Sequence, residues 1–291
     1  MKMFATATKR LGQASAILLA SVLTVPVNAA VISLVGTRSE LATIEQGFIA
    51  AGDTTTRYGD WSSLSAAQLN DIFMSDIVWE GDIFNGISND VQSRMTNFVG
   101  SNGGLFLTAE RPCCETHNAA IQQIGRDLTG DLGLLVGGLG FDVFDHVFSN
   151  SPTTILTDPF DIRNQPAQHN GPGRVQPTGG VNSDACFTVS NPGNPVCTAA
   201  AWGPDVLVDN MGRLVIYGDI NSQPSLVNNF NSEQFLNIRS FLLAGFTGGE
   251  DTCDTNPNLP GCPTTDIPVP GTLALMSLGS LLLFWRRRRA A

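Results

Sequence analysis

Apolar residues recur with two different periods along the central part of this chain. Short, uninterrupted apolar runs predict buried strands, at residues 31–36, 76–79, 105–108, 142–148 and 153–156. Apolar residues three and four positions apart predict helices, at 40–51, 64–73, 88–100, 116–128 and 232–243. Residues 205–208 and 213–217 predict a hairpin. Apolar strands alternating with helices favour an α/β fold: an open, mostly parallel, flavodoxin-like sheet with helices on both faces.

Composition divides the chain into a body and two distinctive ends. Residues 30–246 are long enough for one globular domain with a large core. Within it, residues 157–200 are rich in Pro, Gly and Asn, which predicts a loop-rich insertion. Residues 247–266 are polar and Pro-rich and predict a stalk.

The N-terminus has the three parts of a secretory signal peptide. Lys2, Lys9 and Arg10 form a positive region, and residues 14–25 are apolar. Val27-Asn28-Ala29 resembles a small-x-small cleavage site. We therefore expect residues 1–29 to be a signal peptide read by the Sec export machinery.

The C-terminus combines a short apolar run with a basic cluster. Residues 271–285 carry no charge, and as a helix they would be about 22 Å long. A hydrocarbon core is about 30 Å thick, so this single membrane helix would be short for a permanent span. Arg286, Arg287, Arg288 and Arg289 follow at once and would stay on the cytoplasmic side.

Residues 267–291 resemble a PEP-CTERM sorting signal, the tag of exosortase substrates in Gram-negative bacteria. That signal has a Pro-x-Pro motif, a membrane helix and an arginine cluster. Here the motif is Pro268-Val269-Pro270, with Val269 where Glu is usual. The resemblance implies an inner-membrane intermediate, cleavage near the motif by an exosortase-type enzyme, and a final place at the cell surface or outside the cell.

The body of the protein is strongly acidic. Removing the seven basic residues of the two ends from the total of sixteen leaves nine arginines against 26 acids, a formal net charge of about −17. A lysine-free, acidic surface does not bind nucleic acid by counterion release. It is suited to recruiting divalent cations, so calcium is the cofactor to consider if there is any.

Six cysteines fit an oxidising compartment. Cys186 and Cys197 enclose a short loop, as do Cys253 and Cys262, so two local disulfides are the preferred pairing. The adjacent Cys113 and Cys114 could form a vicinal disulfide, stay as thiols, or pair with distant cysteines.

Acidic side chains follow three of the predicted strands. Glu80 and Asp82 end one, Glu110 follows the next, and Asp219 follows 213–217. Because ligands of open parallel sheets bind at the carboxyl ends of strands, these acids are candidates for binding a cation or sugar hydroxyls. The alternative is that they cap helices and lie near the positive N-terminal ends of helix dipoles. His117, His146 and His169 lack ligand spacing, and we expect them to be ordinary partly buried or surface residues.

The order of elements resembles the class I glutamine amidotransferase-like fold, including non-catalytic relatives such as ThuA-like domains. The segments that carry it are Asp76-Ile77-Val78, residues 103–107 and residues 213–219. An active member needs a cysteine on a sharp, glycine-flanked turn. Cys113 and Cys114 come too late after their strand and lack those glycines, so oxidised structural cysteines are expected instead.

These patterns predict an exported, surface-sorted protein that is not an enzyme. We expect an extracellular matrix or exopolysaccharide-associated binding or structural component, because exosortase systems commonly accompany exopolysaccharide production. The alternative is a carbohydrate-active or other hydrolase that uses the acids at the carboxyl edge of the sheet.

Overall fold

The computed structural model describes residues 29–138, 146–151, 153–167, 169–190, 195–209, 211–223, 227 and 232–244. Several predicted features lie outside these residues. They are the signal peptide up to Asn28, the stalk, the helix at 271–285, the motif Pro268-Val269-Pro270 and the pair Cys253 and Cys262.

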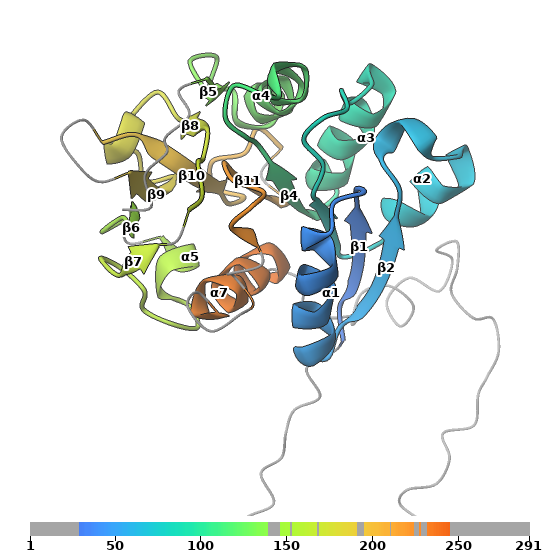
Figure 1. The fold of residues 1–291 in the computed structure, drawn as a ribbon, viewed down its shortest axis with the longest axis horizontal. Coiled ribbons are helices and arrows are strands. Elements are labelled where there is room, and N and C mark those ends of the chain that lie inside the picture. Colours follow the sequence, from blue (N-terminus) through green and yellow to red (C-terminus); the bar gives the residue numbers. More distant parts are fainter. Residues whose placement is uncertain are drawn as a thin grey trace, which may run out of the picture.

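A nine-stranded mixed sheet forms the centre of the molecule, in the order β2-β1-β3-β4-β11-β10-β9-β6-β7 (Figure 1). The parallel part comprises β2 (Thr54–Tyr58), β1 (Val31–Val35), β3 (Ile77–Glu80), β4 (Gly104–Thr108) and β11 (Arg213–Tyr217). The antiparallel part comprises β10 (Cys197–Trp202), β9 (Cys186–Ser190), β6 (His146–Phe148) and β7 (Pro166–Ala167). A small second sheet pairs β5 (Leu135–Gly137) with β8 (Arg174–Gln176). The predicted α/β class with a largely parallel sheet is confirmed, and the antiparallel part is an addition to it.

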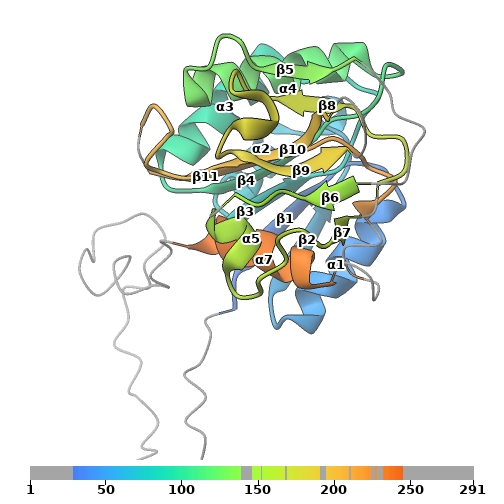
Figure 2. The same ribbon diagram turned by 90° about the vertical axis from the view of Figure 1, so that its left-hand side faces the viewer.

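Helices cover both faces of this sheet (Figures 1 and 2). One face carries α2 (Ala66–Ile72), α3 (Asn89–Gly100) and α4 (Glu115–Thr129), with the short 3₁₀ helices η1 (Trp61–Ser63) and η2 (Gly180–Asn182). The other face carries α1 (Glu40–Ala50), α5 (Thr154–Thr157) and α7 (Ser232–Leu243). Alternate residues of the central strands enter two separate apolar cores, so Val78 and Leu105 pack under the first group while Trp79 and Phe106 pack under the second.

Local sequence signals fix the ends of several helices. Ser65 and Gln68 form a capping box at the start of α2. The hydroxyl of Ser88 accepts a hydrogen bond from the amide of Val91, which confirms it as the cap of α3. The chain leaves α4 at Gly130, whose φ of 69° favours glycine.

Three predictions about elements are wrong. Residues 153–156 begin helix α5, because a four-residue apolar run cannot distinguish a buried strand from a helix. Residues 205–208 form turns and no strand, with the amides of Val206 and Leu207 bonded to the carbonyl of Gly203, so β11 pairs with β10 instead. The segment 157–200 contains β7, β8, β9 and much of β10 as well as loops.

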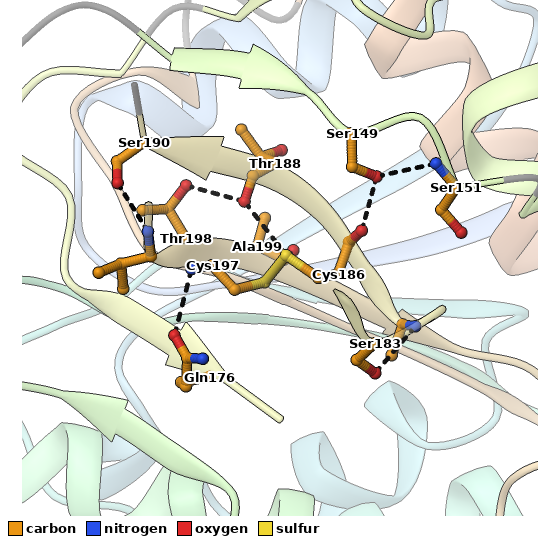
Figure 3. Close-up of a disulfide and its surroundings, with 12 residues drawn as sticks. Ser149, Ser151, Gln176, Ser183, Cys186, Thr188, Ser190, Cys197, Thr198 and Ala199 are labelled. Atoms are coloured by element: carbon orange, nitrogen blue, oxygen red, sulfur yellow. Dashed lines mark hydrogen bonds between the residues drawn. A yellow bond between two sulfur atoms is a disulfide. The ribbon is translucent and has the colours of Figure 1, made fainter. Parts of the chain in front are cut away.

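The predicted pairing of Cys186 with Cys197 is present as a disulfide between β9 and β10 (Figure 3). Its surroundings are tied to neighbouring segments. The amide of Cys197 donates to the side chain of Gln176 in β8, and the hydroxyl of Ser149 donates to the carbonyl of Cys186. The disulfide joins β9 to β10, and these hydrogen bonds connect the two strands to the segments on either side.

The described part of the body begins and ends at one edge of the sheet, the amino edge, where β1, β3, β4 and β11 begin (Figure 2). Asp53 lies there, before β2. It accepts a hydrogen bond from the amide of Ala30 at 3.1 Å and two from the guanidinium of Arg239 in α7, at 2.6 and 2.5 Å. The opposite edge, the carboxyl edge, is free of both ends.

Candidate functional site

The predicted acids lie at the carboxyl edge. Glu80 is the last residue of β3, and Glu110 and Asp219 follow β4 and β11 by two residues. Because these strands are parallel neighbours, the three side chains come to the same edge. All three are at most 1% exposed, and so is Asp82. Their burial means that each carboxylate needs partners inside the protein.

Glu80 forms a buried network with His117 of α4. One Glu80 oxygen accepts from the amide of Asp82 at 2.7 Å, and the other accepts from the amide of Thr108 at 2.9 Å. The His117 Nε2 atom lies 3.4 Å from Glu80 Oε1. The hydroxyl of Thr108 donates to the Glu80 carbonyl and accepts from Gln223. The network therefore joins β3, β4, α4 and the segment after β11.

The hydrogen-bond partners of His117 determine its charge. Its Nδ1 lies 2.7 Å from the carbonyl oxygen of Asn85, and its Nε2 lies 3.1 Å from the carbonyl oxygen of Thr108. Carbonyl oxygens only accept, so both ring nitrogens must carry a proton. Burial by itself would lower the pKa of His117, but the Glu80 carboxylate outweighs it and raises the pKa to about 9. His117 is thus a buried cation paired with Glu80.

Glu110 and Asp219 form a second pair of neighbours with different partners. The oxygens of Glu110 accept from the amides of Arg111 and Ile220. Burial raises the pKa of Glu110 to about 7, and the nearby Asp219 adds to the rise.

Asp219 accepts hydrogen bonds from the backbone amides of Asn170, Asn221 and Ser222. Burial by itself would raise the pKa of Asp219, but its contacts with His169 and with the amide of Asn170 hold the pKa below its ordinary value. The two neighbouring carboxyls therefore titrate in different ranges.

The other two histidines stack beside Asp219. The ring centroids of His146 and His169 are 4.6 Å apart, and the ring of His169 stacks on Tyr217. None of their four ring nitrogens has a hydrogen-bond partner among the described residues, although His169 Nδ1 lies 3.7 Å from Asp219 Oδ2. Burial and the neighbouring His169 together lower the pKa of His146 to about 3. The expectation that the three histidines are ordinary surface or partly buried residues is wrong, because all are at most 2% exposed.

Asp82 serves the turn that follows β3. Its Oδ1 accepts from the amides of Ile83 and Phe84, and its Oδ2 lies 3.4 Å from the side-chain amide of Asn85. Among the residues that the structure describes, no group of three or more His, Cys, Asp or Glu is arranged to hold a metal ion. The acids at the carboxyl edge thus act on backbone amides, and the calcium site stays a prediction.

Cys113 and Cys114 form a vicinal disulfide in the segment between β4 and α4. Cys113 is exposed, whereas Cys114 packs with Ile83 and Ile220 in a small apolar cluster. Oxidised sulfur is not a nucleophile, so this geometry agrees with the structural alternative rather than with thiolate catalysis.

One family model matches the chain. Residues 266–289 match the PEP-CTERM protein-sorting motif. The motif implies export and sorting to the cell surface by way of the membrane, which confirms the sorting-signal resemblance. Within the described residues, no helix has the length and apolar character needed to cross a bilayer. No curated protein matches the chain.

Three solved structures resemble this one at 9% sequence identity, each over 75% of this chain. The mmIFT52 N-terminal domain is covered completely, with a TM-score of 0.51. A putative ThuA-like protein from Parabacteroides merdae is covered to 90% with a TM-score of 0.46, and one from Bacteroides uniformis to 93% with a TM-score of 0.43. The likeness to the mmIFT52 domain shows a shared fold and nothing about function.

Proposed function

We propose that this protein is a non-enzymatic component of the extracellular matrix, exported by the Sec machinery and handed to an exosortase-type enzyme that cuts near Pro268-Val269-Pro270. Its signal peptide is residues 1–29, its body residues 30–246, and its stalk residues 247–266. Residues 271–285 hold it in the inner membrane until it is sorted to the surface, where it associates with exopolysaccharide.

The observation that carries the non-enzymatic part is the use of the acids at the carboxyl edge. Glu80, Glu110 and Asp219 each accept hydrogen bonds from two or more backbone amides, which lie at the end of β4 or in neighbouring loops. A carboxylate whose lone pairs are occupied in this way, and which is buried, stabilises a loop rather than attacking or protonating a substrate. This supports a structural role of the acids over a catalytic one.

Sorting is tested by replacing Arg286–Arg289 with four alanines. The proposal predicts that the variant is still exported. Without the arginines it is not held in the membrane, so the processed form at the cell surface is lost. The measurement is mass spectrometry of the surface and medium fractions, which gives both termini. As a control, alanine at Arg163 and Arg174 in the body should leave processing unchanged. Normal processing of the tail variant would contradict the proposal.

Association with the matrix is tested by retention. Cells that make the full chain are treated with enzymes that degrade polysaccharide, and the protein is followed in the released fraction. We expect release in parallel with the sugars, and no release after a nuclease treatment, because the acidic body repels nucleic acid. If the protein stayed with the cells after the polysaccharide had been removed, the matrix function would be wrong.

One observation favours a hydrolase as the second candidate. Glu110 has a pKa raised to about 7 and lies beside Asp219, whose pKa is lowered. Neighbouring carboxyls with separated pKa values are the usual arrangement of an acid and a base in glycoside hydrolysis. A panel of glycan substrates decides the matter. A hydrolytic activity that disappears in both Glu110→Gln and Asp219→Asn, with Glu233→Gln as the exposed control, would replace the non-enzymatic proposal.

A further inference from the structure

The two cysteines of the Cys113–Cys114 disulfide have different surroundings. Cys113 is exposed, whereas Cys114 is 4% exposed and packs inside a small apolar cluster. In the other disulfide of the described residues, Cys186 and Cys197 are both 0% exposed. Thiol–disulfide exchange requires that a thiolate reach one of the two sulfur atoms. A thiol in solution can therefore approach Cys113, but neither Cys114 nor the bridge between β9 and β10.

Cys114 stands where a released thiolate is stabilised. It is the N-cap residue of α4, a helix of 15 residues, and in the disulfide its side chain accepts no hydrogen bond from the helix amides. A thiolate there can accept from the free amides of the first turn and lies at the positive end of the helix dipole. The His117 cation belongs to the same turn. The exposed Glu115 opposes the thiolate only weakly, because water screens its charge. These features favour the departure of Cys114 when the bridge is attacked at Cys113.

The loop that carries the bridge is also held at its other end. The amide of Glu110 donates to the side-chain oxygen of Asn118 at 3.0 Å, and the side-chain amide of Asn118 donates to the carbonyl of Glu110 at 2.8 Å. Between this contact and the cap of α4 lie the exposed residues Arg111, Pro112 and Cys113. Opening the bridge would therefore release these three residues and leave β4 and α4 in place.

We propose that Cys113–Cys114 is a site of thiol exchange, at which a thiol outside the cell becomes attached to Cys113. The incoming thiolate forms a bond to the sulfur of Cys113, and the bond between the two cysteines breaks. The electron pair of that bond leaves on the sulfur of Cys114, which becomes the cap of α4. One disulfide is consumed and one is formed, so the thiol is the only co-reactant. The same chemistry fits a small thiol and an accessible cysteine of a peptide.

The attachment is reversible, because Cys114 stays next to the new bond. Its attack on the sulfur of Cys113 expels the bound thiol and closes the bridge again. The bridge is thus structural in the resting protein and an electrophile toward thiols. This site does not depend on the matrix function, since neither the sorting signal nor polysaccharide takes part in the exchange.

The test exposes the folded full chain near neutral pH to glutathione in one arm and to a cysteine-containing peptide in another. Acid stops the exchange, free thiols are alkylated under denaturing conditions, and tandem mass spectrometry locates each adduct. We expect the adduct on Cys113 with alkylated Cys114, in at least about tenfold excess over the reverse arrangement. The bridge should also open at least about tenfold faster than Cys186–Cys197, because access differs. Reaction in the glutathione arm assigns a small thiol, and reaction in the peptide arm assigns a peptide cysteine.

Two controls show that the preference comes from the fold. In urea the burial of Cys114 is lost, so the excess of the Cys113 adduct should disappear. The variant Cys186→Ala/Cys197→Ala removes the buried bridge instead and should exchange at Cys113 at the rate of the wild type. Adducts shared equally by Cys113 and Cys114 in the folded protein would overturn the proposal. So would a Cys113–Cys114 bridge that opens no faster than Cys186–Cys197.

Discussion

In the parallel part of the sheet, both ring nitrogens of the buried His117 meet oxygen atoms, and a carboxylate lies beside the ring. Next to the antiparallel part, the ring nitrogens of His146 and His169 have no hydrogen-bond partner among the described residues. The environment of His117 raises the pKa of that ring, whereas the environment of His146 lowers the pKa of its ring. A disulfide fixes the antiparallel part instead. Equal burial thus leads to opposite protonation, because the partners differ.

Removing the carboxylate in the parallel part should have the largest effect. Glu80→Gln leaves the His117 cation without its counter-charge and replaces an acceptor by a donor facing a backbone amide. We expect a loss of about 3–5 kcal/mol in the free energy of unfolding. Urea denaturation measures it, and Glu233→Gln, an exposed control, should stay within about 0.5 kcal/mol. A loss below that of the disulfide variant would show that the ion pair is absent.

Removing the covalent link of the antiparallel part should cost less. Cys186→Ala/Cys197→Ala opens a loop with a sequence separation of 11, for which chain entropy predicts a loss of about 2–3 kcal/mol. The comparison variant is Cys113→Ala/Cys114→Ala, whose bridge encloses no intervening residue. Its urea midpoint should shift less, and a larger shift than in the first variant would contradict the role given to the β9–β10 bridge.

His146 in the antiparallel part should make the folded state less tolerant of acid. The pKa of His146 is about 3 in the folded protein and about 6.5 when unfolded, so the unfolded state binds the extra proton between these values. The contribution of His146 to the free energy of unfolding should fall by about 2 kcal/mol from pH 6.5 to pH 5, while Glu110, whose pKa is raised to about 7, contributes a change of similar size in the opposite direction. The lowered pKa of Asp219 acts in the same direction as that of His146 at lower pH.

Replacing the ring isolates this effect. His146→Leu keeps a similar volume and cannot take up a proton, so its stability relative to the wild type should rise by about 2 kcal/mol as the pH falls from 6.5 to 5. An unchanged pH dependence in this variant would mean that His146 is not the group responsible.

Raising the pH should lower the free energy of unfolding through His117 in the parallel part. Near neutral pH this change should be smaller than the one expected from His146 in acid. The pKa of His117 is raised to about 9, so its stabilisation is complete below about pH 6.5 and is lost as the pH rises through 9. From pH 7 to pH 8 we expect a loss of about 1 kcal/mol. The slope should be absent in Glu80→Gln, because that variant removes the charge that raises the pKa. A slope that persists there would point to another group.

The apolar strands of the parallel part could be predicted because their sequences show it directly. β1, β3, β4 and β11 are buried on both faces and read as continuous apolar runs. β2 could not be found, since the edge strand Thr54–Tyr58 is mostly exposed and polar. The antiparallel strands lie among Pro, Gly and Asn residues. Short strands cannot be recognised there because the composition is that of turns and loops.

The site was predictable in position and not in chemistry. Parallel strands bring their last residues to one edge, so the place of Glu80, Glu110 and Asp219 followed from strand order. Most of their partners are backbone amides, which no side-chain pattern reveals. His117 did leave a signal: it precedes Ala120, Ile121 and Ile124 on the apolar stripe of α4, which marks a buried ring. Nothing in the sequence points to the Glu80 pairing.

The contact between Arg239 and Asp53 decides how the body responds to pulling. If the proposed tail anchors the body, a pull on it enters the described part of the molecule through the C-terminal end of α7. Near that end, the Arg239 guanidinium donates two hydrogen bonds to Asp53. The same carboxylate accepts a hydrogen bond from the amide of Ala30, which directly precedes β1. The load therefore passes from α7 to β1, the strand next to the sheet edge, through the Asp53 carboxylate as well as along the helix.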